Sequence, residues 1–116
     1  MADEQDAEAV LALLGDATVR TILAAASREA LSAKELGAVC DTSVSTVYRR
    51  VDELVDHELL VERTRIEDGG THVSVYETAV RGFDVGLEDG AWAVEPNRRE
   101  DAAGRFTNIW EDIRRS

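Results

Sequence analysis

The chain has 116 residues, the size of one compact domain, and 44% of them are hydrophobic, which excludes a disordered tail. Acidic residues outnumber basic ones by 24 to 13, and the formal net charge of −11 is opposite in sign to the field of most nucleic-acid-binding proteins. No run reaches the roughly 18 to 20 apolar residues of a membrane span, and the acidic start is unlike a secretory signal. We therefore expect a cytoplasmic protein without a membrane partner.

The N-terminal part of the chain shows helical periodicity. Residues 7–14 predict a short helix that Gly15 ends. Asp16 is a suitable N-cap for a second helix. The apolar residues of that helix recur at i, i+3, i+4 and i+7 and share one face: Val19, Ile22, Leu23 and Ala26.

A specific start signal marks a third helix. Ser32 and Glu35 have the spacing of a capping box, in which each side chain accepts a hydrogen bond from the other residue's backbone N–H. The pattern predicts a helix over residues 32–40. We expect Leu36 and Val39 to point inward from it.

A fourth helix is predicted at about 43–57, directly after the three turn-forming residues 41–43. Its apolar residues fall at i, i+4, i+7 and i+8: Val47, Val51, Leu54 and Val55. This stripe is expected to face the core.

After the fourth helix the hydrophobic period changes from 3.6 to 2. Residues 60–66 and 71–78 predict two strands around a turn that contains Asp-Gly-Gly, a strong hairpin signal. A second hairpin is predicted over 83–94 with its turn at 88–90, and Pro96 is expected to end it.

Residues 97–116 predict a last, amphipathic helix with this apolar stripe: Phe106, Ile109, Trp110 and Ile113. The stripe must be buried against the chain's own body or against a second copy. Two bulky aromatic residues on a short terminal helix favour a homodimer contact, to which we also assign Leu11. We expect one domain over residues 1–96, with 97–116 as its dimerisation element.

Catalytic and metal-binding motifs are absent from the sequence. It has no Gly-rich phosphate loop, no nucleophile elbow and no zinc-protease pattern. Cys40 is the only cysteine, so we expect a small buried hydrophobic residue rather than a metal ligand or redox sensor. The sequence therefore predicts no enzyme, no catalytic residue, no metal site and no cofactor.

A short helix and a longer one around a three-residue turn form a helix-turn-helix unit, and a hairpin that follows directly has the placement of a wing. The sequence therefore predicts an α+β fold. Its elements are a winged helix-turn-helix made of a helical bundle and a β-hairpin wing, a second hairpin and a C-terminal amphipathic helix.

Segments of this part of the chain resemble ArsR-like winged helix-turn-helix regulators: residues 32–40, 45–51 and 59–61. Further segments resemble the versions found in halophilic archaea: residues 75–78, 87–90 and 98–112. The resemblance covers roughly residues 8–115. It implies a homodimeric transcription regulator whose fourth helix enters the major groove and whose wing contacts the flanking backbone.

The outer side of the fourth helix suits double-stranded DNA. Residues 42–51 contain no acid, although acids make up about one-fifth of the chain. Hydroxyls suit phosphate oxygens and an arginine can bind guanine through two hydrogen bonds. The candidate DNA contacts here are Thr42, Ser43, Ser45, Thr46, Tyr48, Arg49 and Arg50. Alternatively, the two arginines pair with neighbouring acids such as Asp52 or Glu53.

Three further basic residues are candidate phosphate contacts. Arg63 and Arg65 share one face of the first predicted strand, and Lys34 lies near the start of the third helix. The wing tip carries Glu67 and Asp68, which repel phosphates. We therefore expect the helix, not the wing tip, to enter a groove.

The acidic composition also indicates the salt concentration in which the protein works. Lys34 is the only lysine, and an acidic, lysine-poor surface keeps a protein soluble in concentrated salt. The alternative is an acidic protein with a basic partner. The sequence thus predicts a nucleoid-associated DNA-binding transcription regulator of a halophile. The other hypothesis is a winged-helix protein–protein module of a transcription complex that does not contact DNA.

Overall fold

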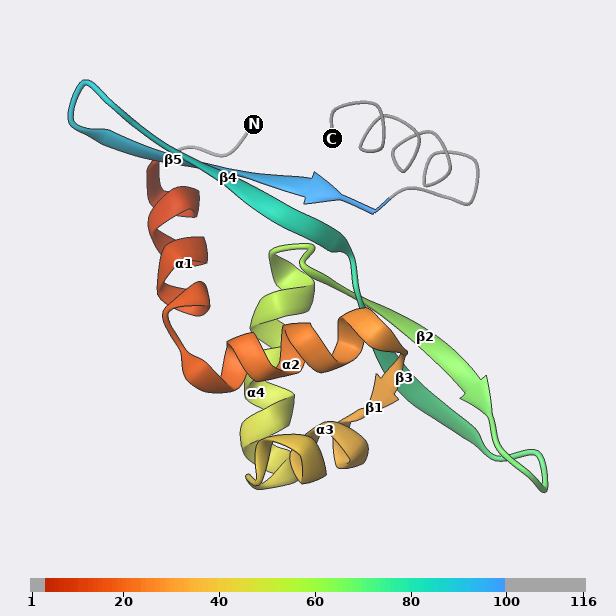
Figure 1. The fold of residues 1–116 in the computed structure, drawn as a ribbon. Helices are drawn as coiled ribbons and strands as arrows, with labels where there is room; N and C mark the ends of the chain where they lie inside the picture. Colours follow the sequence, from red (N-terminus) through yellow and green to blue (C-terminus); the bar gives the residue numbers. More distant parts are fainter. Residues whose placement is uncertain (1–3, 100–116) are drawn as a thin grey trace.

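The computed structural model describes residues 4–99 of the chain. Helices fill the first half and strands the second (Figure 1). The elements are α1 Glu4–Leu14, α2 Ala17–Arg28, β1 Leu31–Ser32, α3 Ala33–Cys40, α4 Val44–Asp56, β2 Leu60–Ile66, β3 His72–Thr78, β4 Val80–Glu88 and β5 Ala91–Arg98. The order of helices and hairpins and the α+β class agree with the prediction.

The predicted starts of α2, α3 and α4 are confirmed by their caps, whereas α1 begins at Glu4, three residues before its predicted start. The Asp16 carboxylate accepts a hydrogen bond from the backbone N–H three residues later, at 3.1 Å. At the start of α3 the Ser32 hydroxyl accepts from the Glu35 N–H at 3.1 Å, and the Glu35 carboxylate accepts from the Ser32 N–H at 2.8 Å. The Ser43 hydroxyl caps α4 in the same way, at 3.2 Å. Local sequence alone therefore sets where these helices begin.

The turn between α3 and α4 depends on close backbone contact. Asp41 ends α3 in the left-handed conformation, with φ of 53°. The Thr42 N–H then donates to the Gly37 carbonyl at 3.1 Å. A Cβ atom at Gly37 would lie 3.2 Å from the Thr42 carbonyl oxygen, so a side chain there would push the turn apart.

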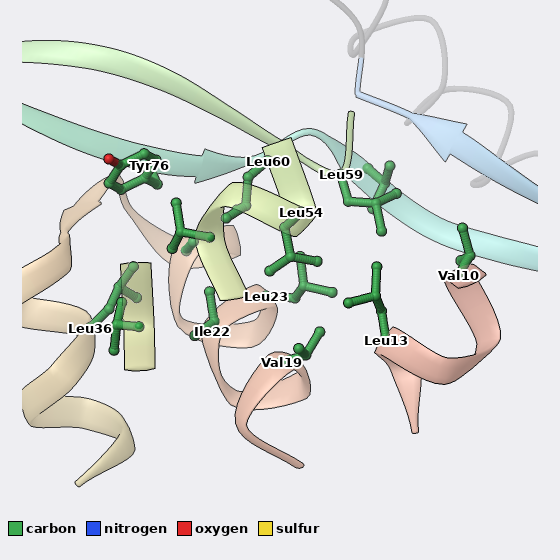
Figure 2. Close-up of a cluster of buried hydrophobic side chains, with 14 of the residues drawn as sticks. Val10, Leu13, Val19, Ile22, Leu23, Leu36, Leu54, Leu59, Leu60 and Tyr76 are labelled. Atoms are coloured by element: carbon green, nitrogen blue, oxygen red, sulfur yellow. The ribbon is translucent and has the colours of Figure 1, made fainter. Parts of the chain in front are cut away.

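The core lies between the helices and the root of the first hairpin (Figure 2). Its largest fully buried side chains are Ile22, Leu36, Leu54, Leu59, Val19, Val47 and Val51. Figure 2 shows Val10 and Leu13 of α1 beside this cluster. Among residues 4–99 no single helix is long and apolar enough to cross a membrane, although α1 and α2 meet a length and composition test as a pair bent by 84°.

The prediction that Val39 points inward is wrong, because its side chain is 52% exposed. The buried face of α3 is formed by Ala33, Leu36 and Gly37, and the side chain of Cys40 is half-buried on the same side. At about 100° per residue, Val39 lies roughly 110° around the helix from the centre of that face. The short helix turns Val39 away from α2 and α4.

The first hairpin is anchored in the core at one end. Strands β2 and β3 pair from Leu60–Thr78 to Ile66–His72, and β1 completes a three-stranded antiparallel sheet in the order β1-β3-β2. The Thr78 hydroxyl is buried and donates to the Leu23 carbonyl of α2 at 2.7 Å. The far end of the hairpin extends beyond the helices as a wing (Figure 1). The fold of the described residues is a winged helix-turn-helix with an added hairpin.

The added hairpin is a two-stranded ribbon of β4 and β5. Its turn residues Asp89 and Gly90 have φ of 53° and 79°, which fits a two-residue type I′ turn. Helix α1 packs on β5, and Val94 is buried beneath it. The prediction that Pro96 ends the hairpin is wrong, since β5 continues to Arg98. A proline is compatible with an edge strand wherever no partner needs its N–H.

Candidate nucleic-acid interface

Helix α4 presents a line of exposed side chains opposite its buried stripe. Ser45, Arg49, Asp52 and Asp56 recur at i, i+4, i+7 and i+11, so they share the outer face. The polar and basic members of this line occupy the N-terminal half of α4, and the acids occupy the C-terminal half. Only the first half of the helix therefore suits an anionic partner.

The two adjacent arginines of α4 have different surroundings. Arg50 turns toward α2, where its guanidinium lies 3.0 Å from the Asp16 carboxylate and 3.1 Å from that of Glu53. Arg49 is exposed and makes no ion pair with any residue of the described range 4–99. The pairing alternative thus applies to Arg50, with Asp16 as a partner that spacing along the helix could not reveal.

Some hydroxyl groups at the start of α4 make contacts within the chain, and others are exposed to solvent. The Ser43 hydroxyl caps the helix and donates to the Thr46 hydroxyl at 2.9 Å, so both serve the helix start. The side chain of Thr42 is half-buried in the tight turn. Ser45 is exposed on the outer line, and the exposed Tyr48 lies on the flank of α4 toward the wing.

The wing arginines are held by acids. The Arg65 guanidinium lies 3.2 Å from the Glu35 carboxylate and 3.1 Å from that of Glu67, and the looser pair of Arg63 and Glu77 spans 3.8 Å. The Ser32 N–H, followed by Arg65, holds the pKa of Glu35 below its usual range. The same pairing raises the pKa of Arg65. Arg65 therefore connects the wing to the start of α3.

Sequence reasoning missed two exposed hydroxyls on the other face of the wing. Thr64 and Ser74 lie opposite each other in the β2–β3 register, on the face that carries Tyr76. Burial raises the pKa of Tyr76, and the nearby Glu62 and Tyr48 raise it further, so this face borders α4. The two-residue alternation of the strands puts Thr64 and Ser74 on one face of the wing and the positively charged Arg63 and Arg65 on the other.

Comparison with known proteins bears on this arrangement. Residues 10–63 match the family model described as a helix-turn-helix domain, a span that runs from α1 into β2. This segment has the fold of a helix-turn-helix domain. No curated protein sequence matches the chain. Within the domain α3 and α4 form the motif, and α4 holds the place of the recognition helix.

Two other predicted residues lie on the motif's first helix, α3. Lys34 is exposed and has no ion pair within residues 4–99. The half-buried Cys40 packs against the core of the helix-turn-helix domain, and burial raises the pKa of its thiol. Within the described part of the chain, no three His, Cys, Asp or Glu side chains are grouped to hold a metal ion.

The predicted dimer residues are placed only in part. Leu11 is half-buried against the core of the helix-turn-helix domain. The other four lie outside the described residues: Phe106, Ile109, Trp110 and Ile113. Dimerisation through them stays a prediction from the sequence.

Proposed function

We propose that the protein is a homodimeric transcription regulator of the ArsR-like type that places α4 in the major groove of DNA. One observation carries the proposal. Arg49 is exposed and lacks an acidic partner within residues 4–99, although acids hold three other arginines of the candidate site, Arg50, Arg63 and Arg65. A protein with a formal charge of −11 that leaves this guanidinium available offers an anionic partner one defined point of contact.

The arrangement of α4 indicates how it would dock. Arg49 is positioned for two hydrogen bonds to guanine, and Ser45 and the first backbone N–H groups of the helix suit phosphate oxygens. Asp52 and Asp56 repel the DNA backbone from the other half of the helix. We infer that α4 enters the groove by its N-terminal half, with its C-terminal half tilted away.

The wing would then contact the flanking backbone through its α4-facing side. Thr64 and Ser74 offer exposed hydroxyls on the strand face that carries Tyr76 and are the first candidates for phosphate contacts. Of the wing arginines, Arg63 has the longer ion pair and is the one more easily released to a phosphate. Lys34 is a further backbone candidate.

A homodimer would place two recognition helices in successive major grooves, one helical turn of about 34–36 Å apart. Occupancy of such a site blocks or recruits polymerase. The apolar stripe around Trp110 supports a contact between copies, and a Trp110→Ala variant that keeps the mass of wild type in light scattering would count against this role.

The composition supports a cytoplasm of high salt. At molar salt, counterion release adds little to DNA affinity, so binding must depend on a small set of close contacts. This accords with a single available arginine on α4. We expect the affinity to fall less steeply with salt than the number of phosphate contacts implies.

The test is fluorescence anisotropy with labelled genomic DNA fragments in molar potassium chloride. Arg49→Ala should weaken binding. Arg28→Ala is the matched control, since it removes an equal charge from an exposed residue at the end of α2. If both variants bind as wild type does, α4 is not the recognition helix. Absence of DNA binding at every salt concentration would favour the winged-helix protein–protein module.

A further inference from the structure

The β4–β5 ribbon has an apolar face between the pair Phe83–Pro96 and the turn. The register places these side chains on it: Phe83, Val85, Leu87, Trp92, Val94 and Pro96. Helix α1 covers the inner part, where Val94 is buried, but the ribbon continues beyond α1 (Figure 1). On that outer part Val85, Leu87 and Trp92 are 50%, 56% and 43% exposed. A free two-stranded ribbon of this kind is at best marginally stable in water.

The two edges of the ribbon differ in their capacity for further pairing. The pair Glu88–Ala91 closes a two-residue turn, so these two residues hydrogen-bond to each other. Hydrogen-bonded and non-hydrogen-bonded pairs alternate from there along the ribbon. In the non-hydrogen-bonded pairs, beginning with Leu87–Trp92, the backbone N–H and C=O groups point away from the partner strand. Pro96 occupies such an outward position on β5 and removes a donor from that edge. The β4 edge contains no proline and presents the N–H and C=O groups of Val85 and Leu87 to an additional strand.

We propose that β4 pairs antiparallel with β4 of a second copy of the chain, about a two-fold axis at Val85. The two ribbons then form one four-stranded sheet with a continuous apolar face. Val85 lies opposite its own copy, and Leu87 lies opposite Phe83. Such a contact is isologous, so it closes as a dimer and leaves no open β4 edge.

Charge selects this register among its neighbours. A two-fold axis at Asp84 would place this carboxylate opposite its own copy, and an axis at Gly86 would place it opposite Glu88. Like charges directly opposite each other destabilise a strand pair. With the axis at Val85, Asp84 lies opposite Gly86 and Glu88 lies opposite Gly82, so each acid faces a residue without a side chain.

This register also accounts for two glycines that the single chain does not explain. A Cβ atom at Gly82 or Gly86 would meet nothing within 4 Å. Neither residue has the positive φ of Gly69, Gly70 or Gly90. A glycine inside a strand weakens it, so the positions call for a reason such as close approach of another strand.

The inference concerns the chain alone and does not depend on DNA binding. Its test is sedimentation equilibrium of the full chain without DNA. Gly86→Lys places a cation opposite Asp84 of the partner copy, and Gly86→Glu places an anion there. Two symmetry-related pairs should tighten the dimer for Gly86→Lys and weaken it for Gly86→Glu, with dissociation constants about 2- to 30-fold from that of a neutral Gly86→Gln variant. Both charged variants lose the same glycine, so their difference reports charge.

Ala93→Lys and Ala93→Glu are the matched controls, because Ala93 pairs with Gly86 on the same face of the ribbon but lies on β5. The dimer dissociation constants of these two variants should differ from that of an Ala93→Gln variant much less than those of the Gly86 variants differ from Gly86→Gln. Equal effects at the two positions, or a chain that is monomeric throughout, would overturn the pairing. A dimer that responds to Trp110→Ala and is indifferent to Gly86 would assign the contact to residues 97–116 instead.

A crosslink tests the geometry directly. In a Cys40→Ala background, Val85→Cys should form a disulfide-linked dimer under mild oxidation, because opposed residues of a hydrogen-bonded pair have Cα atoms about 5.5 Å apart, within disulfide range. Ala93→Cys, also exposed, is the control. Crosslinking of Val85→Cys no faster than that of Ala93→Cys would exclude an axis at Val85.

Discussion

Adjacent arginines of α4 should separate into one that affects binding and one that affects stability. Replacing Arg49 by alanine removes an exposed side chain without an ion pair inside residues 4–99, so the free energy of unfolding should change by less than about 0.5 kcal/mol. The DNA affinity should fall about 5- to 150-fold per recognition helix, since a bidentate arginine–guanine contact contributes about 1–3 kcal/mol.

Replacing Arg50 by alanine removes two bridges, to Asp16 at 3.0 Å and to Glu53 at 3.1 Å. The three side chains are 27% to 50% exposed, so each bridge contributes about 0–1 kcal/mol. The Nε atom of Arg50 is buried without a hydrogen-bond partner, which offsets part of this gain. We expect a loss of about 1 kcal/mol, or ~5 °C in Tm, and a change in DNA affinity below about threefold.

Urea denaturation followed by circular dichroism, at fixed protein concentration, gives the stabilities, and fluorescence anisotropy gives the affinities. Arg50→Lys is the matched control, since it keeps the charge toward Asp16. The reasoning is refuted if Arg50→Ala costs as much affinity as Arg49→Ala while its urea midpoint equals that of wild type.

Three other substitutions test separate parts of the structure. Gly37→Ala should lower the free energy of unfolding by about 1 kcal/mol because its Cβ crowds the turn after α3, and a urea midpoint equal to that of wild type would contradict this. Asp52→Asn should raise DNA affinity about 2- to 5-fold near 0.15 M salt and progressively less toward 1 M, and no gain in anisotropy would place that half of α4 away from DNA. The Ser32 N–H, followed by Arg65, lowers the pKa of Glu35, so this carboxylate gives stability that is present above about pH 4.3 and is lost as the pH falls through the folded-state value. Glu35→Gln should therefore show a flatter acid-unfolding curve over about pH 2–5, and a curve as steep as that of wild type would argue against these two contacts of the carboxylate.

Features that depend on a few neighbouring residues could be predicted from the sequence. The capping box of Ser32 and Glu35 sets the start of α3 within one turn of chain, and the turn chemistry at Gly69 and Asp89 sets both hairpins. These signals act over three or four residues and need no knowledge of the tertiary structure.

Features that depend on how elements meet could not be predicted. Asp16 is 34 positions from Arg50 along the chain, and Glu35 is 30 from Arg65, so neither ion pair has a signature in sequence spacing. The exposure of Val39 depends on how α3 is rotated against the core. Positive charge pointed to the wing arginines, whereas the strand register places the hydroxyls of Thr64 and Ser74 on the opposite face of the wing.

The carboxylate of Glu35 acts as a strut for the wing. It accepts the Ser32 N–H at the start of α3 and pairs with the Arg65 guanidinium on β2, so one side chain links the helix start to the hairpin, in addition to the pairing of β1 with β3. A wing held at a set angle before DNA arrives loses less conformational freedom on binding. Removal of the Glu35 carboxylate should leave α4 in place and increase the mobility of the wing. The complex with DNA should then form with a larger entropic penalty and have a shorter residence time.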